Sequence, residues 1–205
     1  MKILHIDCSP RAESYSRALS AGIVDRLLET HPAAVIVRRD LGRYPIPHAL
    51  EDYARALSSP AALAHSDDTG AMELSEQLIQ EVEAADIVVI GTPMNNFTVP
   101  SVLKAWIDQI LRFSRTFTAA GPGVKVGLLR DRPVYIGVAS GGVFAGERAN
   151  QPDFLRPYLI AALGCVGLQT LHFLPLQATA FLERDDIAVA FDDLLATFDT
   201  LAAAA

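Results

Sequence analysis

Short runs of apolar residues alternate with longer amphipathic segments along the whole chain. The runs are almost continuously apolar, as in residues 87–90, which is typical of parallel strands buried on both faces. The longer segments repeat apolar residues at helical spacing, as Leu103, Trp106 and Ile110 do. Strands are therefore predicted at residues 2–7, 33–40, 86–91, 133–139 and 168–174, and helices at residues 16–29, 72–84, 103–111, 153–163 and 185–201.

Strands that alternate with helices in this way predict an α/β fold built from βαβ units. Right-handed crossovers place the helices on both faces of one five-stranded parallel sheet, which gives three layers. The chain of 205 residues has the length of one domain with a sizeable core, so residues 1–205 are expected to form a single domain.

Two long segments do not fit the alternation of strands and helices. Residues 42–70 contain three prolines and the polar run His65-Ser66-Asp67-Asp68, and residues 115–132 contain Gly121-Pro122-Gly123. Segments this long in a compact domain are expected to be lids, interface segments or mobile loops. The terminal residues 202–205, all alanine, are expected to fray.

Composition and charge narrow the classes of function. Apolar residues make up 51% of the chain and charged residues 20%, which predicts a packed globule. The net charge of −7 argues against a broad surface for nucleic acid, and no apolar run is long enough for a membrane span or a signal peptide. Cys8 and Cys165 are the only cysteines, and the five histidines lie far apart. We therefore expect a soluble cytoplasmic protein without a disulfide framework or a metal site.

In an open parallel sheet, ligands bind beyond the carboxyl ends of the strands. The first such turn contains Ser9, Ser14 and Ser16 and leads into a helix. Serine hydroxyls and the N–H groups of a helix N-terminus bind phosphate well. A helix cap made by Ser14 or Ser16 explains these residues equally well, so both interpretations stay open.

The turn after the third strand reads Thr-Pro-Met-Asn-Asn-Phe-Thr-Val-Pro, residues 92–100. Prolines fix extended geometry, Asn95 and Asn96 bring amide groups and tolerate left-handed backbone, and Phe97 offers a flat apolar face. This set suits a planar ring edged with heteroatoms. A turn followed by a helix, with Thr98 as its cap and Pro100 in its first turn, is the alternative.

The turn after the fourth strand contains Ala139, Ser140, Gly141 and Gly142, followed by Phe144. Paired glycines permit close approach of the backbone to a ligand, although they also suit an ordinary tight turn. Three ligand-shaped turns at carboxyl ends of successive strands favour a binding site more than any one of them does.

At Pro93-Met94-Asn95-Asn96-Phe97 and at residues 99–108, Val-Pro-Ser-Val-Leu-Lys-Ala-Trp-Ile-Asp, the sequence resembles one enzyme family. It is similar to the FMN-dependent NADH-azoreductases and NAD(P)H:quinone oxidoreductases, which have the flavodoxin-like fold and are related to DT-diaphorase. The resemblance implies a sheet with strand order 2-1-3-4-5. It also implies that FMN is bound by three groups of residues: Ser9, Ser14, Tyr15 and Ser16 at the phosphate; Pro93, Met94, Asn95, Asn96 and Phe97 around the ring; and Ala139, Ser140, Gly141 and Gly142 on its pyrimidine side.

The same resemblance implies the reaction. Two electrons pass as hydride from NADH or NADPH to FMN and then to a quinone or an azo compound, with ping-pong kinetics and no catalytic side chain beyond the cofactor. Phe117 and Phe144 are implied to line the substrate pocket, and a homodimer is implied in which residues 42–70 and 115–132 complete the partner's site. The chain departs from the family at Asn95, where members often have an aromatic residue, and at Thr118-Ala119, where some members have one, which implies a roomier or differently selective pocket.

Other functions fit the residues less well. A Cys-x5-Arg phosphatase loop starting at Cys8 requires arginine at position 14, where this chain has Ser14. No metal-ligand spacing supports an acyl-carrier-protein phosphodiesterase, and no Gly-x-Gly-x-x-Gly follows the first strand, as a dinucleotide-binding enzyme requires. A flavodoxin-type electron carrier remains the alternative, although the two long segments favour a covered site that admits substrates.

Overall fold

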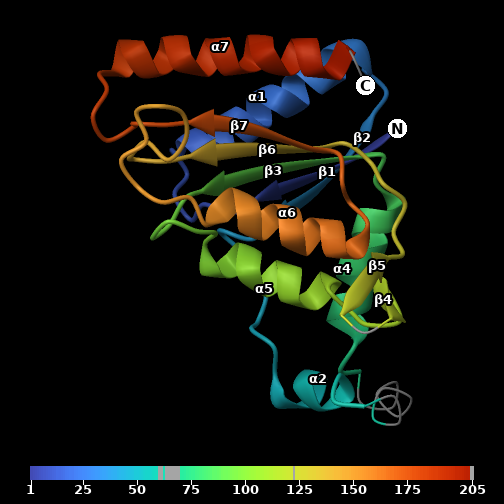
Figure 1. The fold of residues 1–205 in the computed structure, drawn as a ribbon. Helices are drawn as coiled ribbons and strands as arrows, with labels where there is room; N and C mark the ends of the chain where they lie inside the picture. The colour runs from blue at the N-terminus through green and yellow to red at the C-terminus, as the bar shows by residue number, and fades with distance from the viewer. Residues whose placement is uncertain (60–61, 63–69, 122, 204–205) are drawn as a thin grey trace.

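The structure is a computed structural model that describes residues 1–59, 62, 70–121 and 123–203 (Figure 1). Its strands are β1 (Lys2–Asp7), β2 (Val35–Asp40), β3 (Ile87–Pro93), β4 (Phe117–Gly121), β5 (Val124–Gly127), β6 (Val134–Ala139) and β7 (Leu171–Leu176). Its helices are α1 (Tyr15–Thr30), α2 (Glu51–Ala56), α4 (Glu73–Ala84), α5 (Ser101–Ile110), α6 (Leu155–Val166) and α7 (Arg184–Ala203).

The central sheet is parallel and has the order β2-β1-β3-β6-β7. This is the predicted order 2-1-3-4-5, because β4 and β5 form a separate antiparallel pair and raise the numbers of the last two strands. The predicted α/β fold with one five-stranded parallel sheet is confirmed.

Helices cover both faces of the sheet, as predicted. Helices α1 and α7 lie on one face, and α4, α5 and α6 lie on the other (Figure 1). Successive residues of β3 point to opposite faces: Val89 packs in the core with Leu19 and Phe198, whereas Ile90 packs in the core with Trp106. This alternation explains why the strands are apolar at almost every position.

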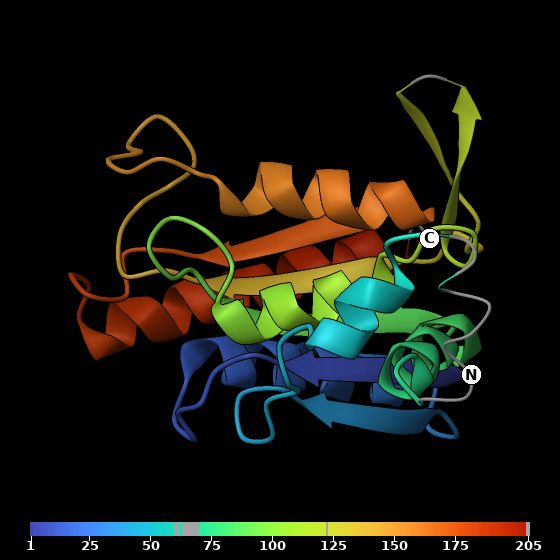
Figure 2. The same ribbon diagram turned by 90° about the horizontal axis from the view of Figure 1, so that it is seen from below.

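The two long segments contain more regular structure than the sequence predicts. Residues 51–56 form α2, and the strands Phe117–Gly121 and Val124–Gly127 pair as the β4–β5 hairpin, which projects from the body of the protein (Figure 2). The last strand also begins later than predicted, at Leu171 rather than at residue 168. Pro60, the polar run 65–68, Pro122 and the last two alanines lie outside the described residues.

No helix among the described residues combines the length and the apolar composition that crossing a lipid bilayer requires.

Candidate functional site

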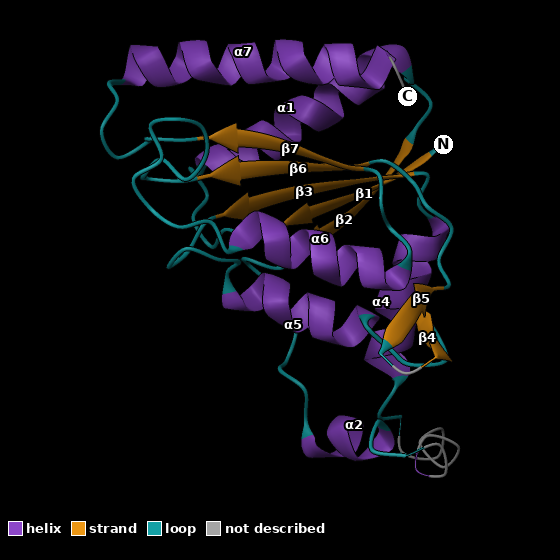
Figure 3. Cartoon of the chain, in the orientation of Figure 1, coloured by secondary structure: helices purple, strands orange, loops and turns teal. Residues whose placement is uncertain are grey.

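The three predicted turns meet at one edge of the sheet. The arrowheads of all five strands of the sheet point to the same side (Figure 3). Asp7, the last residue of β1, is the register partner of Gly91 in β3, and Pro93 at the end of β3 is the partner of Ala139 at the end of β6. The turns that follow β1, β3 and β6 are therefore neighbours, as the sequence predicts.

The first turn joins buried hydroxyl groups to the start of α1. Ser9 is 3% exposed and Ser16 is fully buried, while the hydroxyl oxygens of Ser14 and Ser16 share a hydrogen bond of 3.0 Å. Ser14 occupies the cap position of α1, but its side chain makes no capping hydrogen bond. Ser14 is therefore the helix-cap residue by position, but its hydroxyl does not cap the helix and bonds to the Ser16 hydroxyl instead.

Close packing brings this helix start to the sheet. A Cβ atom on Gly91 would lie 2.5 Å from the Ser20 hydroxyl and 2.6 Å from the Ser16 carbonyl oxygen, so only glycine allows α1 to lie this near to β3. The uncapped N–H groups of the first turn of α1 then lie at the carboxyl edge of the sheet. Such a helix N-terminus favours an anion.

The second turn is a tight hairpin with unusual backbone geometry. Asn95 and Thr98 exchange two backbone hydrogen bonds of 2.9 and 3.0 Å. Asn96 and Phe97, between them, both have positive φ, at 47° and 71°. A positive φ is strained for phenylalanine. Packing of the Phe97 ring in the core does not offset this strain, because the residue is 44% exposed. The turn thus holds a flat apolar ring in solvent at the edge where ligands of this fold bind.

Helix α5 begins two residues later than the capping alternative requires. Pro100 is its cap residue, whereas Thr98 belongs to the hairpin and makes no side-chain cap. The alternative in which Thr98 caps the helix is wrong.

The third turn is fastened to the second by a residue that the sequence did not single out. The Gln151 side-chain amide donates to the Ser140 hydroxyl at 2.9 Å and lies 3.2 Å from the Met94 sulfur. The Met94 N–H donates to the Ala139 carbonyl at 2.9 Å. Gln151 therefore holds the turns after β3 and β6 together across Gly142.

The segment after β7 supports the third turn from the other side. The Gln177 side-chain oxygen accepts hydrogen bonds from the N–H groups of Phe144 and Ala145, both at 2.8 Å. The Thr179 hydroxyl donates to the Ser140 carbonyl at 3.1 Å. These long-range contacts leave no periodic signal in the sequence, which is why the prediction missed Gln151, Gln177 and Thr179.

The two predicted substrate-pocket aromatics lie apart. Phe144 follows β6 near the turns, but it is only 3% exposed and packs in the core with the Arg156 guanidinium 5.3 Å from its ring centre. Phe117 begins β4, which lies at the amino end of the sheet, away from the three turns (Figure 1). One chain therefore does not bring Phe117 to the candidate site.

Cys8 lies beside the first turn, but its thiol is not reactive. Its side chain is fully buried, and burial, with the nearby Asp7 carboxylate, raises the pKa of the thiol far above its ordinary value. A thiol held in the neutral form is a poor nucleophile. This agrees with the interpretation of Cys8 as an ordinary residue at a strand end.

The whole chain matches one known family. Residues 1–200 match the family described as having a flavodoxin-like fold. The chain belongs to this flavodoxin-like family. Two curated relatives are both named FMN-dependent NADH:quinone oxidoreductase. FMN-dependent NADH:quinone oxidoreductase 4 of Pseudomonas fluorescens is 47% identical over 180 residues, which are 87% of this chain and 85% of that protein. FMN-dependent NADH:quinone oxidoreductase 2 of Cupriavidus pinatubonensis is 45% identical over 202 residues, which are 98% of this chain and 97% of that protein.

Solved structures of the flavodoxin-like fold agree with the observed topology. An azoreductase from Bacillus anthracis superposes with a TM-score of 0.83 over 98% of this chain and 99% of that chain, at 22% identity. An FMN-dependent NADH-azoreductase from the same species, in complex with FMN, gives 0.82 over 98% of this chain and 100% of that chain, at 22% identity. At this identity the likeness supports the fold alone. The predicted resemblance to the azoreductase and quinone oxidoreductase family is confirmed by the curated relatives.

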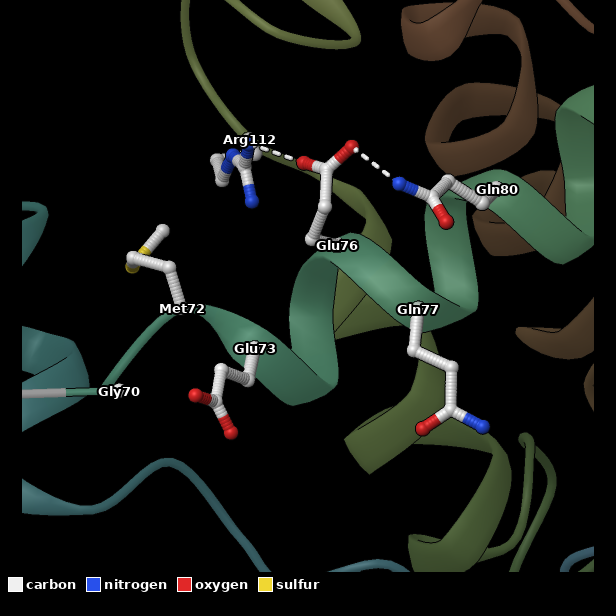
Figure 4. Close-up of a pocket in the computed structure, with 7 residues that line it drawn as sticks. All are labelled: Gly70, Met72, Glu73, Glu76, Gln77, Gln80 and Arg112. Atoms are coloured by element: carbon white, nitrogen blue, oxygen red, sulfur yellow. Dashed lines mark hydrogen bonds and ion pairs between the residues drawn. The ribbon is translucent and has the colours of Figure 1, made fainter. Parts of the chain in front are cut away.

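A hollow with a volume of about 490 Å³ lies beside α4, away from the three turns (Figure 4). Arg112 donates to Glu76 at 2.6 Å across it. Hydrogen bonds from Arg115 and Arg112 lower the pKa of the Glu76 carboxyl to about 2. Glu76 is therefore ionised at neutral pH and braces α4 against the segment after α5.

Proposed function

We propose that this protein is an FMN-dependent NAD(P)H oxidoreductase that passes two electrons from NADH or NADPH to quinones or azo compounds. The observation that carries the proposal is 45% identity along 98% of the chain to a protein named FMN-dependent NADH:quinone oxidoreductase. The three adjoining turns at the carboxyl edge of the sheet support it, because this is where the fold binds its ligands.

The residues at these turns fit FMN. Ser9, Ser14, Tyr15 and Ser16 would hold the phosphate, because the buried hydroxyls of Ser9 and Ser16 and the uncapped N-terminus of α1 stabilise an anion without an added cation. The exposed ring of Phe97 and the amides of Asn95 and Asn96 suit a flat ring with polar edges. The proposed ring-binding residues from the second and third turns are Pro93, Met94, Asn95, Asn96, Phe97, Ala139, Ser140, Gly141 and Gly142.

Bound FMN would supply the redox chemistry, by accepting hydride from the nicotinamide and delivering two electrons to the second substrate. The protein's own part is to place the two substrates in turn over one exposed face. The side-chain amides of Asn95 and Asn96 would stabilise negative charge on the reduced ring. Use of one face by both substrates is the basis for the proposed ping-pong order.

We further propose a homodimer, in which the hairpin of one chain reaches the site of the other. The hairpin exposes Val124 at 54% and Val126 at 42%, and a two-stranded hairpin needs packing to be stable. Phe117 lies at its base, remote from the turns of its own chain, so it would contribute to a substrate pocket only across the interface. Any role of the buried Phe144 in that pocket stays a prediction.

The proposed location is the cytoplasm, which supplies NADH and NADPH. Both cysteines are free thiols, as a reducing compartment allows.

Flavin uptake tests the proposal. The purified protein, stripped of ligand, should take up one FMN per chain and turn yellow, and titration of FMN fluorescence measures this. Bovine serum albumin at the same concentration serves as a control for non-specific uptake. A folded protein that takes up no FMN contradicts the proposed function.

A further inference from the structure

Arg17 lies in the first turn of α1, directly after the serines of the first turn, yet its guanidinium does not face outward. Its Nε and Nη2 atoms donate to the Ser9 carbonyl oxygen at 2.8 and 2.5 Å. Nη1 and Nη2 donate to the two carboxylate oxygens of Asp40 at 2.8 and 2.5 Å, and Nη1 also lies 3.5 Å from the Asp7 carboxylate. Arginine has five N–H donors in a rigid fork, and the fork of Arg17 makes four hydrogen bonds to Ser9 and Asp40 besides the ion pair with Asp7.

These partners link two neighbouring strands to the helix. Asp7 ends β1, Asp40 ends β2, and the two residues are register partners in the sheet. Their carboxylates would repel each other, and Arg17 lies within reach of both with its side chain only 13% exposed. The Ser20 hydroxyl and the His5 ring occupy the other side of Asp7, at 2.9 and 3.5 Å. Arg17 is therefore already committed to Ser9, Asp40 and Asp7, and its guanidinium faces these groups instead of a phosphate.

The network fixes Ser9 in particular. The Ser9 carbonyl lies between Arg17 and Gly42, where a Cβ atom would come within 2.1 Å of that oxygen. The Ser9 hydroxyl oxygen accepts a hydrogen bond from the Arg11 N–H at 3.3 Å. Its proton has no acceptor among the residues that the structure describes, so Ser9 presents a held hydroxyl with a proton to donate.

We propose that Arg17 is a positioning residue for cofactor binding: the Arg17–Asp40 pair holds Ser9 so that its hydroxyl donates to the FMN phosphate, and Arg17 itself does not bind the phosphate. This rests on the proposed function. It assigns a role to the ion pair between α1 and the end of β2 that is separate from the roles of the serines, and it predicts an effect confined to the phosphate.

The first test compares FMN with riboflavin, which lacks only the phosphate. In Arg17→Lys, the charge remains but the fork that grips both Ser9 and Asp40 is lost. Loss of a charge-assisted hydrogen bond at the phosphate should raise the dissociation constant for FMN about tenfold. The dissociation constant for riboflavin should stay unchanged. Fluorescence titration of the ligand-free full chain measures both.

Arg39→Lys is the matched control. Arg39 neighbours Asp40 in β2 and forms a comparable partly buried ion pair, with Glu81, on the other face of the sheet. This variant should bind FMN and riboflavin like the wild type. A similar loss of FMN in Arg39→Lys would mean that any broken arginine pair has the effect, which overturns the assignment to Arg17.

Asp40→Asn separates positioning from direct binding. Removal of a negative charge near the phosphate would by itself tighten FMN binding, and it would also release Arg17 toward the phosphate. Positioning predicts the opposite sign: FMN binds more weakly because Arg17 loses its anchor, while riboflavin binding is unchanged. This variant also decides the matter should Arg17→Lys fail to fold, as judged by its thermal unfolding.

The outcomes are distinct. Unchanged or tighter FMN binding in Asp40→Asn, or equal losses of FMN and riboflavin in the folded variants, overturns the positioning role. Failure of the wild-type protein to bind FMN instead overturns the proposed function, since the inference concerns only how that FMN is held.

Discussion

At the scale of single residues, the proposed phosphate site depends on Ser16. Its side chain is fully buried in the first turn of α1 beside Ser14. Ser16→Asp would place a carboxylate where the phosphate is proposed to bind, and two like charges a few ångströms apart in a partly buried site repel by several kcal/mol, on the order of 4. We expect FMN affinity to fall at least about a hundredfold in fluorescence titration.

Thr200→Asp controls for the added charge, because Thr200 is exposed in the last turn of α7, outside the three turns and both long segments. It should bind FMN normally. Wild-type affinity in Ser16→Asp would show that the phosphate binds elsewhere.

The residue types predicted the hydroxyl groups of the first turn better than the backbone geometry of the second. Serines before a helix pointed to the hydroxyls that the structure gathers there. Asn96 at positive φ follows from the tolerance of asparagine for left-handed backbone, but nothing in the sequence indicated the same geometry for Phe97. Arg17 and Gln151 were not anticipated, because one partner of each, Asp40 and Met94, lies 23 and 57 residues away in sequence.

At the scale of elements, the β4–β5 hairpin carries the proposed dimer contact. Val124 and Val126 lie two residues apart on β5 and so face the same way. Val126→Lys would place a charge in the proposed interface without a partner, which is unfavourable. Light scattering should show dimers for the wild type and a shift to monomers for the variant. FMN binding should persist, and quinone turnover should fall.

The matched control is Val35→Lys, which changes a valine that is 56% exposed at the start of β2. It should remain dimeric. A wild-type monomer with full activity would contradict the dimer, and an unaffected dimer in Val126→Lys would remove the hairpin from its interface.

The sequence predicted most strands of the central sheet well, but it missed the β4–β5 hairpin and placed the start of β7 too early. The hairpin lacks a strong apolar pattern, so Gly121 and Gly123 were interpreted as loop residues. The start of β7 was placed early because Leu168 is apolar. In the structure its N–H instead donates to Leu163 at 3.0 Å and ends α6, while Asp131 accepts the N–H groups of Gln169 and Thr170 before the strand begins.

At the scale of the whole molecule, the fold was predictable because the three central strands of the sheet, β1, β3 and β6, are buried on both faces. That burial makes their residues apolar almost without interruption, and the helices between strands show the complementary pattern. The strand order came instead from the resemblance to a family, because spacing alone does not determine which strands are neighbours. The resemblance also named residues 115–132, which contain the hairpin, as a segment that contacts a partner, and this stays a prediction.

In the proposed function, electrons pass from NADH through FMN to a second substrate. The most direct measurement of this transfer is the visible absorbance of the FMN-loaded protein without oxygen. The proposed function predicts that NADH alone removes the yellow absorbance. A quinone, added after the released NAD⁺ is separated, should then restore it. FMN-loaded protein that keeps its absorbance with excess NADH, or that loses it and is not reoxidised by quinone, would contradict the proposed function.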